Sequence, residues 1–141
     1  MAKIRLEIVT AERLVYSEDV EGIIAPGVGG ELGILPQHAP LMTVIEPGMI
    51  TVKQGGNELD MAVSGGFMEV RPERIIILAD AAERADEIDM ARAEEARRRA
   101  EEAKTNAATA GAEAQMAAEA ALARALVRIK VAQRRRREKP T

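Results

Sequence analysis

The sequence has no cysteine and no tryptophan, and its aromatic side chains are limited to Tyr16 and Phe67. Without cysteine, the chain can form no disulfide, no thiolate metal site and no cysteine nucleophile. With so few aromatic side chains, it cannot build the stacking platform on which many proteins bind single-stranded nucleic acid. The composition therefore excludes several classes of redox, metal and nucleic-acid protein.

Histidine is almost as scarce, because His38 is the only one. It lies in an expected turn between Pro36 and Pro40, and no nucleophile elbow accompanies it. A single imidazole also argues against a metal cluster. We expect no catalytic residue and no metal site, hence no enzyme, and interpret His38 as a loop or interface residue.

Long apolar runs are absent as well. No stretch approaches the ~18 uncharged apolar residues of a membrane span. The N-terminal segment carries a charge at every second position, at Lys3, Arg5 and Glu7, which is not typical of a secretory signal. Any membrane association is therefore expected to come through a partner.

One glycine-rich segment, residues 27–33, has the superficial look of a phosphate-binding loop. Its third glycine, Gly33, falls one place too late for the dinucleotide pattern, and a strand-like Ile34-Leu35 follows where a helix is required. We interpret these residues as turn and bulge glycines.

The net charge of −3 conceals two unlike halves. Residues 1–80 hold 6 Lys and Arg against 12 Asp and Glu, whereas residues 81–141 hold 14 against 11. An arginine run near the end, 134–137, is one mark of nucleic-acid binding. The acidic total and the lack of a groove-reading motif favour an acidic protein partner instead, with no nucleic acid.

The first half, residues 1–84, reads as short strands. Ile4, Leu6 and Ile8 alternate with more polar neighbours, and similar runs recur between segments rich in proline and glycine. This spacing predicts an α+β chain whose N-terminal domain is an antiparallel β-sandwich or flattened barrel.

The second half, residues 85–141, is expected to be helical, because 20 of the residues from 81 onward are alanine. Asp86 or Asp89 can cap the first helix. A break at Thr105-Asn106 and Gly111 gives two helices, at about 88–105 and 112–134. The basic tail from Arg134 to Thr141 is expected to fray.

Each predicted helix carries small residues at steps of three and four, the repeat of a helix-to-helix contact. The members are Ala93, Ala96, Ala100 and Ala103 in the first helix and Ala118, Leu122, Ala125, Ile129 and Ala132 in the second. At roughly 25 cal/mol per Å2, small side chains bury too little area to hold a contact firmly. We expect an antiparallel two-helix hairpin that is only weakly closed.

Four arginines of the hairpin allow two interpretations. Arg92 and Arg99 are two turns apart on one helix, and Arg124 and Arg128 one turn apart on the other. Together they can bind phosphate, since arginine suits that geometry. Alternatively, they belong to a solvated face and pair with glutamates at 94, 95, 101 and 102.

Several segments resemble the epsilon subunit of bacterial-type F-type ATP synthases. The resemblance rests on residues 30–41 (GELGILPQHAPL), 64–70 (SGGFMEV), 78–84 (LADAAER), 88–93 (IDMARA) and 121–132 (ALARALVRIKVA). These segments follow the family's order and span almost the whole chain.

The resemblance implies a sandwich of about ten strands, followed by a two-helix hairpin, in a non-catalytic rotor subunit. The sandwich would dock on the gamma subunit and the c ring, with Glu31, Leu32, Gly33 and His38 towards the c ring. The hairpin would extend towards the alpha and beta subunits and inhibit ATP hydrolysis. The place would be the cytoplasmic face of the bacterial plasma membrane, with membrane contact only through the c ring.

In some bacterial members the folded hairpin lies against the sandwich and binds ATP, and the resemblance carries that regulatory site onto Glu83, Ile88, Asp89, Arg92, Ala93, Arg99, Arg124 and Arg128. Ala123 stands where ATP-binding relatives can carry lysine, which leaves one positive charge fewer. No cofactor is otherwise expected. A free-standing ATP-binding sensor is the alternative of a different class.

Overall fold

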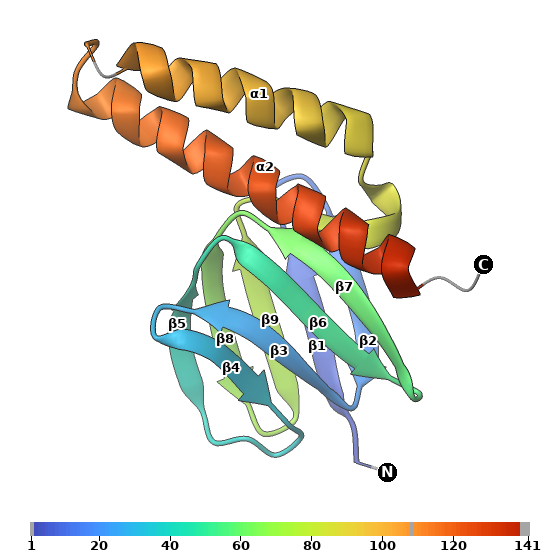
Figure 1. The fold of residues 1–141 in the computed structure, drawn as a ribbon. Helices are drawn as coiled ribbons and strands as arrows, with labels where there is room; N and C mark the ends of the chain where they lie inside the picture. Colours follow the sequence, from blue (N-terminus) through green and yellow to red (C-terminus); the bar gives the residue numbers. More distant parts are fainter. Residues whose placement is uncertain (1, 108, 139–141) are drawn as a thin grey trace. The chain divides into compact units, whose positions relative to one another are not determined.

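The computed structural model describes residues 2–107 and 109–138. Its contacts divide the chain into two compact units, Met1–Arg84 and Ala85–Thr141. The first unit is built of strands and the second of helices (Figure 1). Each unit is described below by itself.

Ten short strands form the first unit, the number that the family resemblance implies. They are β1 (Ile4–Val9), β2 (Leu14–Val20), β3 (Gly22–Gly27), β4 (Gly30–Ile34), β5 (Leu41–Ile45), β6 (Gly48–Gln54), β7 (Asn57–Val63), β8 (Gly66–Arg71), β9 (Arg74–Ala79) and β10 (Ala82–Arg84).

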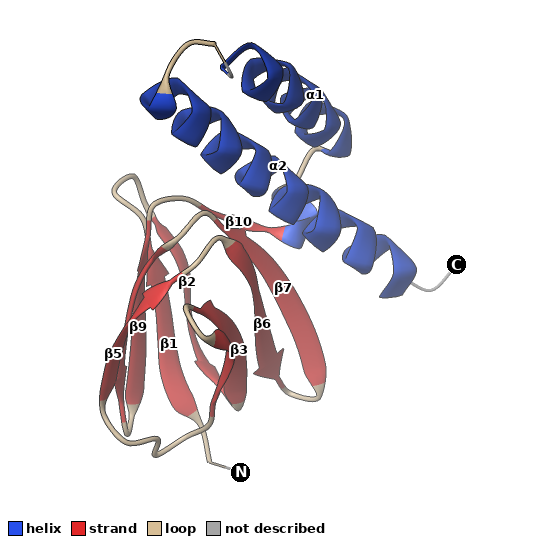
Figure 2. Ribbon diagram, turned by 60° about the vertical axis from the view of Figure 1, so that its left-hand side comes forward, coloured by secondary structure: helices blue, strands red, loops and turns tan. Residues whose placement is uncertain are grey.

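The strands pair in the order β10-β7-β6-β3-β5-β8-β9-β1-β2, with β4 on the other side of β3. Only one residue pair, Gly27 with Ile45, joins β3 to β5. The sheet bends there into two halves that face each other (Figure 2). The expected sandwich is therefore confirmed.

One pairing differs from the antiparallel expectation, because β1 and β9 run parallel. Parallel neighbours need a long connection. Here the connection from β1 to β9 contains all the strands from β2 to β8. Alternation along a strand shows which side chains face inward but cannot reveal this pairing.

The core consists of branched aliphatic and methionine side chains. In β1, Ile4, Leu6 and Ile8 are buried, as the alternation predicts. The largest side chains with almost no exposed surface are Ile4, Leu6, Ile8, Ile34, Ile45, Ile50, Met61, Met68, Ile75, Ile77, Val20 and Val52.

A buried polar pair interrupts the pattern on β6 and β7. Thr51 and Asp60 lie opposite each other and are 3% and 5% exposed. The Thr51 hydroxyl donates to Asp60 Oδ1 at 2.9 Å. A buried polar group is stable only with such a partner, so the pair satisfies a requirement that alternation alone does not reveal.

At Gly66 the fold requires glycine. This residue has a φ of +148°, and an added Cβ would lie 2.1 Å from the carbonyl oxygen of Leu78 on the neighbouring strand. The close approach lets β8 begin its ladder with β9 at this residue.

The helical unit begins with a single turn, η1 (Ala85–Glu87), followed by α1 (Met90–Ala107) and α2 (Ala112–Glu138). The helix α1 passes through Thr105, where a break was expected, and ends at Ala107. The Thr105 hydroxyl donates to the carbonyl of Glu101 at 3.1 Å, a bond that threonine can form within a helix. The helix α2 continues to Glu138, beyond the expected end at 134, and the expected fraying from Arg134 stays a prediction. Arginine is a good helix former. The expectation for 139–141 lies outside the described residues.

The two helices lie side by side as a hairpin (Figure 2). Buried alanines recur every seven residues in both, at Ala93, Ala100 and Ala107 of α1 and at Ala118, Ala125 and Ala132 of α2. Ala103 was expected in this contact but is exposed. Residues 112–117 at the start of α2 are exposed too, although Ala107 at the end of α1 is buried. None of the described helices is long and apolar enough to span a membrane.

Two neighbouring residues of β9 test the position of the core. Ile77 has no exposed surface, whereas Leu78 is 57% exposed on the outer face. We expect Ile77→Ala to lower the free energy of unfolding by about 2–5 kcal/mol, because it leaves a cavity. Leu78→Ala should lower it by about 1 kcal/mol or less. Urea denaturation of both variants measures the difference, and equal losses would contradict the described core.

Candidate functional site

The first candidate residues lie at the start of α1. The Asp89 carboxylate accepts the backbone N–H of Arg92 at 3.2 Å through Oδ1. Its Oδ2 lies 3.7 Å from Nε of Arg92. Of the two caps that the sequence allowed, Asp89 is therefore the one used. Its charge is already engaged by the helix end and by one arginine.

Other arginines of α1 form ion pairs along their own helix. Arg99 Nη2 lies 3.0 Å from Glu95 Oε1, and Arg97 Nη1 lies 3.5 Å from Glu101 Oε1. Both pairs are solvent-exposed and one turn apart, so each stabilises the helix by only about 0.3–0.5 kcal/mol. These contacts fit the interpretation of a solvated face.

The heptad positions show how these arginines are arranged. Arg92 and Arg99 directly precede the buried Ala93 and Ala100, and Arg124 directly precedes Ala125. In an antiparallel helix pair, the positions just before the buried residues lie along the same flank of the contact. Arg92, Arg99 and Arg124 therefore share one flank of the hairpin. Arg124 is exposed, and Arg128, one turn further along α2, is half-buried.

The remaining residues of the expected ATP site differ in solvent exposure, and one of them belongs to the strand unit. Ala93 has no exposed surface, so it can support a site only by letting the two helices approach closely. Ile88 is half-buried in the connection before α1. Glu83 belongs to β10 of the first unit, opposite Ala62 of β7, whereas the other seven belong to the helical unit.

The residues expected to face a c ring belong to β4 and the loop after it. Glu31 and Gly33 are exposed, whereas Leu32 packs partly against the core. His38 is partly exposed, and its Nδ1 lies 2.7 Å from the carbonyl oxygen of Ala39. The structure thus presents alternate residues of β4 on an accessible edge.

Between β4 and β5 the loop is fixed by a tight turn. The His38 N–H donates to the Leu35 carbonyl at 3.2 Å, and Gln37 has a φ of +69°. Proline at the second position and a positive φ at the third are the pattern of a type II turn. The Gln37 N–H also donates to the Pro72 carbonyl at 2.8 Å, which ties the loop to the β8–β9 turn.

A surface that sequence reasoning missed crosses the outer face of one half-sheet. Cross-strand partners align five apolar side chains, which we call the outer apolar row: Val44, Phe67, Leu78, Val9 and Leu14. Phe67 and Leu78 are each 57% exposed. The signal was present in β9, where residues 75–79 are all apolar, whereas a strand with one face in water usually alternates apolar and polar residues.

Beyond this row, the same face becomes polar. Arg71, Arg74 and Arg5 form a register row across β8, β9 and β1. Each pairs with a carboxylate: Arg71 with Glu69 at 2.8 Å, Arg74 with Glu7, and Arg5 with Asp19 at 3.4 Å. The face thus combines an apolar strip with a balanced charged border.

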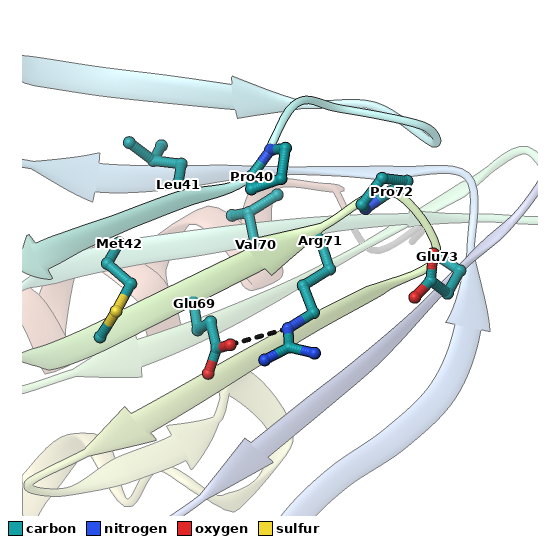
Figure 3. Close-up of a pocket in the computed structure, with 8 residues that line it drawn as sticks. All are labelled: Pro40, Leu41, Met42, Glu69, Val70, Arg71, Pro72 and Glu73. Atoms are coloured by element: carbon teal, nitrogen blue, oxygen red, sulfur yellow. Dashed lines mark hydrogen bonds and ion pairs between the residues drawn. The ribbon is translucent and has the colours of Figure 1, made fainter.

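A shallow recess of about 510 Å3 opens beside this border, between the start of β5 and the end of β8 (Figure 3). Its wall is mainly apolar, and the paired Glu69 and Arg71 side chains form part of its lining. The lining residues are Pro40, Leu41, Met42, Glu69, Val70, Arg71, Pro72 and Glu73. Met42 is 74% exposed, so the recess extends the apolar surface along β5.

Both units of the chain match domains of one known protein family. Residues 3–85 match the beta-sandwich domain of the ATP synthase delta/epsilon chain, and residues 86–133 match its long alpha-helix domain. The chain belongs to the ATP synthase delta/epsilon chain family. The resemblance expected from the sequence is therefore confirmed.

Individual relatives agree over most of the chain. The ATP synthase epsilon chain of Dehalococcoides mccartyi strain CBDB1 is 54% identical over 97% of both chains. That of Desulforamulus reducens is 52% identical over 92% of this chain and 96% of the relative. In the mitochondrial ATP synthase of Euglena gracilis, one chain has the same fold, with a TM-score of 0.79 and 24% identity. That match covers 94% of this chain and 82% of the other.

The cap of α1 can be tested apart from any ligand. We expect Asp89→Ala to lower the stability of the helical unit by about 0.5–2 kcal/mol, because the N–H of Arg92 loses its partner. Asp89→Asn keeps an acceptor and should recover most of the loss. Glu94→Ala removes the same charge from the exposed side of α1 and serves as the control. Thermal unfolding followed by circular dichroism gives the comparison, and an asparagine variant as unstable as the alanine variant would contradict the cap.

Proposed function

We propose that the chain is the non-catalytic epsilon subunit in the central stalk of a proton-translocating ATP synthase, where it couples the gamma subunit to the c ring. The observation that carries the proposal is the outer apolar row, exposed on the sandwich of a chain whose relatives are ATP synthase epsilon chains. The chain itself would perform no chemistry, and catalysis would belong to other subunits.

The outer apolar row has the properties of a docking surface. Phe67 is one of only two aromatic residues in the chain, yet more than half of its surface is exposed. Aromatic side chains at the centre of an interface commonly contribute most of its binding energy, and a polar border excludes water around them. The Arg–carboxylate row can form such a border beside a gamma subunit.

Contact with the c ring would use a different part of the sandwich. Glu31 and Gly33 are exposed on β4, and the type II turn holds His38 close behind them. Through this contact alone the chain would sit peripherally at the cytoplasmic face of a bacterial plasma membrane. A rigid turn suits this role, because coupling requires that torque is not lost in a flexible loop.

For the helical unit we propose regulation. When the hairpin opens and extends, its arginines and lysines can hold it against acidic surfaces of the alpha and beta subunits and block ATP hydrolysis. The alanine contact supports this role because it buries little area and therefore opens at small cost. The same weakness lets a ligand that binds only the closed hairpin control the inhibition.

ATP is the ligand that we propose for the closed hairpin. A triphosphate near Arg92, Arg99, Arg124 and Arg128 would gain charge-assisted hydrogen bonds of roughly 1.5–3 kcal/mol each, before screening. The competing pairs with Asp89 and Glu95 are much weaker. Even a net difference of ~3 kcal/mol would change the ratio of closed to open hairpins more than a hundredfold. Asp89 and Glu83 would serve the cap, the ribose or the base, because carboxylates repel phosphate.

Reconstitution with F1 that lacks this subunit tests docking and inhibition together. We expect the full chain to bind and to lower ATP hydrolysis. Deletion of residues 86–141 should leave binding intact and relieve the inhibition. Phe67→Asp should weaken binding by at least about 2 kcal/mol, roughly thirtyfold, because it buries a charge at the centre of the interface.

Val28→Asp is the matched control, since Val28 is 68% exposed but lies in the turn between β3 and β4 and does not belong to the outer apolar row. It should bind F1 like the unaltered chain. Full binding by the Phe67→Asp variant would remove the outer apolar row from the proposal. Unchanged hydrolysis after the deletion would remove the regulatory role and leave docking in place.

Calorimetry of the isolated chain with ATP tests the proposed ligand. We expect Arg92→Ala and Arg128→Ala each to weaken binding by roughly ten- to a hundredfold, because each removes a charged donor. Arg98→Ala removes an exposed arginine from the other side of α1 and should leave binding unchanged. Absence of heat at millimolar ATP would refute ATP binding, and equal effects of all three variants would place the nucleotide elsewhere.

A further inference from the structure

The last strand of the sandwich, β10, is held by only a short backbone ladder. β10 has three residues, lies at the edge of the sheet and pairs with β7 only, through Ala82, Glu83 and Arg84. Just before it, the Ser64 N–H donates to the Ala81 carbonyl at 3.0 Å. Short edge ladders of this kind are among the first parts of a protein to open.

A side chain gives β10 a second attachment. Arg84 Nη2 donates to the Val15 carbonyl at 2.8 Å, and the guanidinium carbon lies 5.7 Å from the centre of the Tyr16 ring. Val15 and Tyr16 belong to β2, the strand at the opposite end of the sheet order. Arg84 therefore connects the two terminal strands of the sheet.

A bulge in β2 makes this contact possible. Ile8 pairs with Tyr16 and Val9 pairs with Leu14, so Val15 has no opposite residue in β1. The extra residue of a bulge is displaced from the regular ladder. Its carbonyl is then available to the guanidinium group, which is a charged donor and forms the stronger kind of hydrogen bond.

Tyr16 is in turn held in one position. The ring is 4% exposed, and its hydroxyl donates to Oε1 of Gln54 on β6 at 3.0 Å. Gln54 Nε2 donates back to the Asp19 carbonyl of β2 at 3.3 Å. Burial, and next the charge of Glu18, raise the pKa of Tyr16, whereas Arg84 lowers it. The hydroxyl thus stays protonated at neutral pH and continues to donate.

We propose that Arg84 is a positioning residue: its clasp on Val15 and Tyr16 fixes the last residue of the sandwich, so that movement of the hairpin starts at Ala85 and not within β10. The clasp lies at the last residue of the first unit, and the helical unit begins with the next residue. The movement itself rests on the proposed function, whereas the clasp does not. A fixed pivot keeps the docked sandwich unchanged while the hairpin opens.

Hydrogen exchange of the full chain, followed by mass spectrometry, tests the clasp. We expect Arg84→Gln to speed exchange of 82–84 and 14–16 by roughly tenfold, since it removes a charged hydrogen bond and a cation–π contact. Exchange in β8 and β9 should be unchanged. Arg84→Lys keeps a cation near the ring and should restore part of the protection. Lys53→Gln removes a different exposed cation from the sandwich and should change neither segment.

Unchanged exchange of 82–84 in the Arg84→Gln variant would overturn the proposal. So would a uniform rise over all strands, because that would show a general loss of stability and not a local clasp. Tyr16→Phe keeps the ring and should retain protection of 82–84, and loss there would assign the effect to the hydroxyl. If no variant of the chain inhibits hydrolysis but these exchange results hold, the proposed function fails and the clasp stands.

Discussion

Packing of branched aliphatic side chains between the two half-sheets is the interaction on which the rest of the molecule depends. Each strand is too short to persist alone, and the core contains almost no aromatic surface. Twelve large side chains with almost no exposed surface supply the cohesion, each contributing roughly 1.5–3 kcal/mol on burial. This core lets the sandwich present Phe67 and Leu78 to solvent without losing its fold, as the proposed docking surface requires.

The helical unit follows the opposite principle. Its recurring buried positions are mostly alanine, which allows the helices to approach closely but removes little apolar area from water. Stability is therefore uneven along the chain, and the parts that move in regulation are generally those with low local stability. Ion pairs such as Arg99–Glu95 favour each helix separately and do not join the two. In the proposed regulation, the hairpin would thus open while its helices stay intact.

The sequence was sufficient for features that depend on local periodicity. Alternation and spacing predict the inward residues of β1, the sandwich class and the heptad of α2. Position in the sequence also limited the cap of the first helix to two residues, one of which was Asp89. Features that depend on distant residues were not predictable. The parallel β1–β9 pair, the Thr51–Asp60 hydrogen bond and the exposure of Ala103 each depend on which segments meet in space. The outer apolar row is intermediate, because its apolar runs are visible in the sequence but their alignment depends on register.

The arginine site shows a different limit of sequence reasoning. An arginine one turn from a glutamate is consistent with a solvated helix face and equally with a phosphate site. Both interpretations place the same arginine on the same face of the helix, so the sequence cannot distinguish them. The choice depends on energies: exposed intrahelical pairs contribute a few tenths of a kcal/mol, whereas a triphosphate offers several stronger contacts at once. In the absence of ATP, Arg92 and Arg99 pair with carboxylates of their own helix, and bound ATP would replace these partners. Weak pairs hold the arginines near the flank without committing them, and under the proposed ATP regulation a hairpin closed by alanines would respond to the small free energy that this exchange provides.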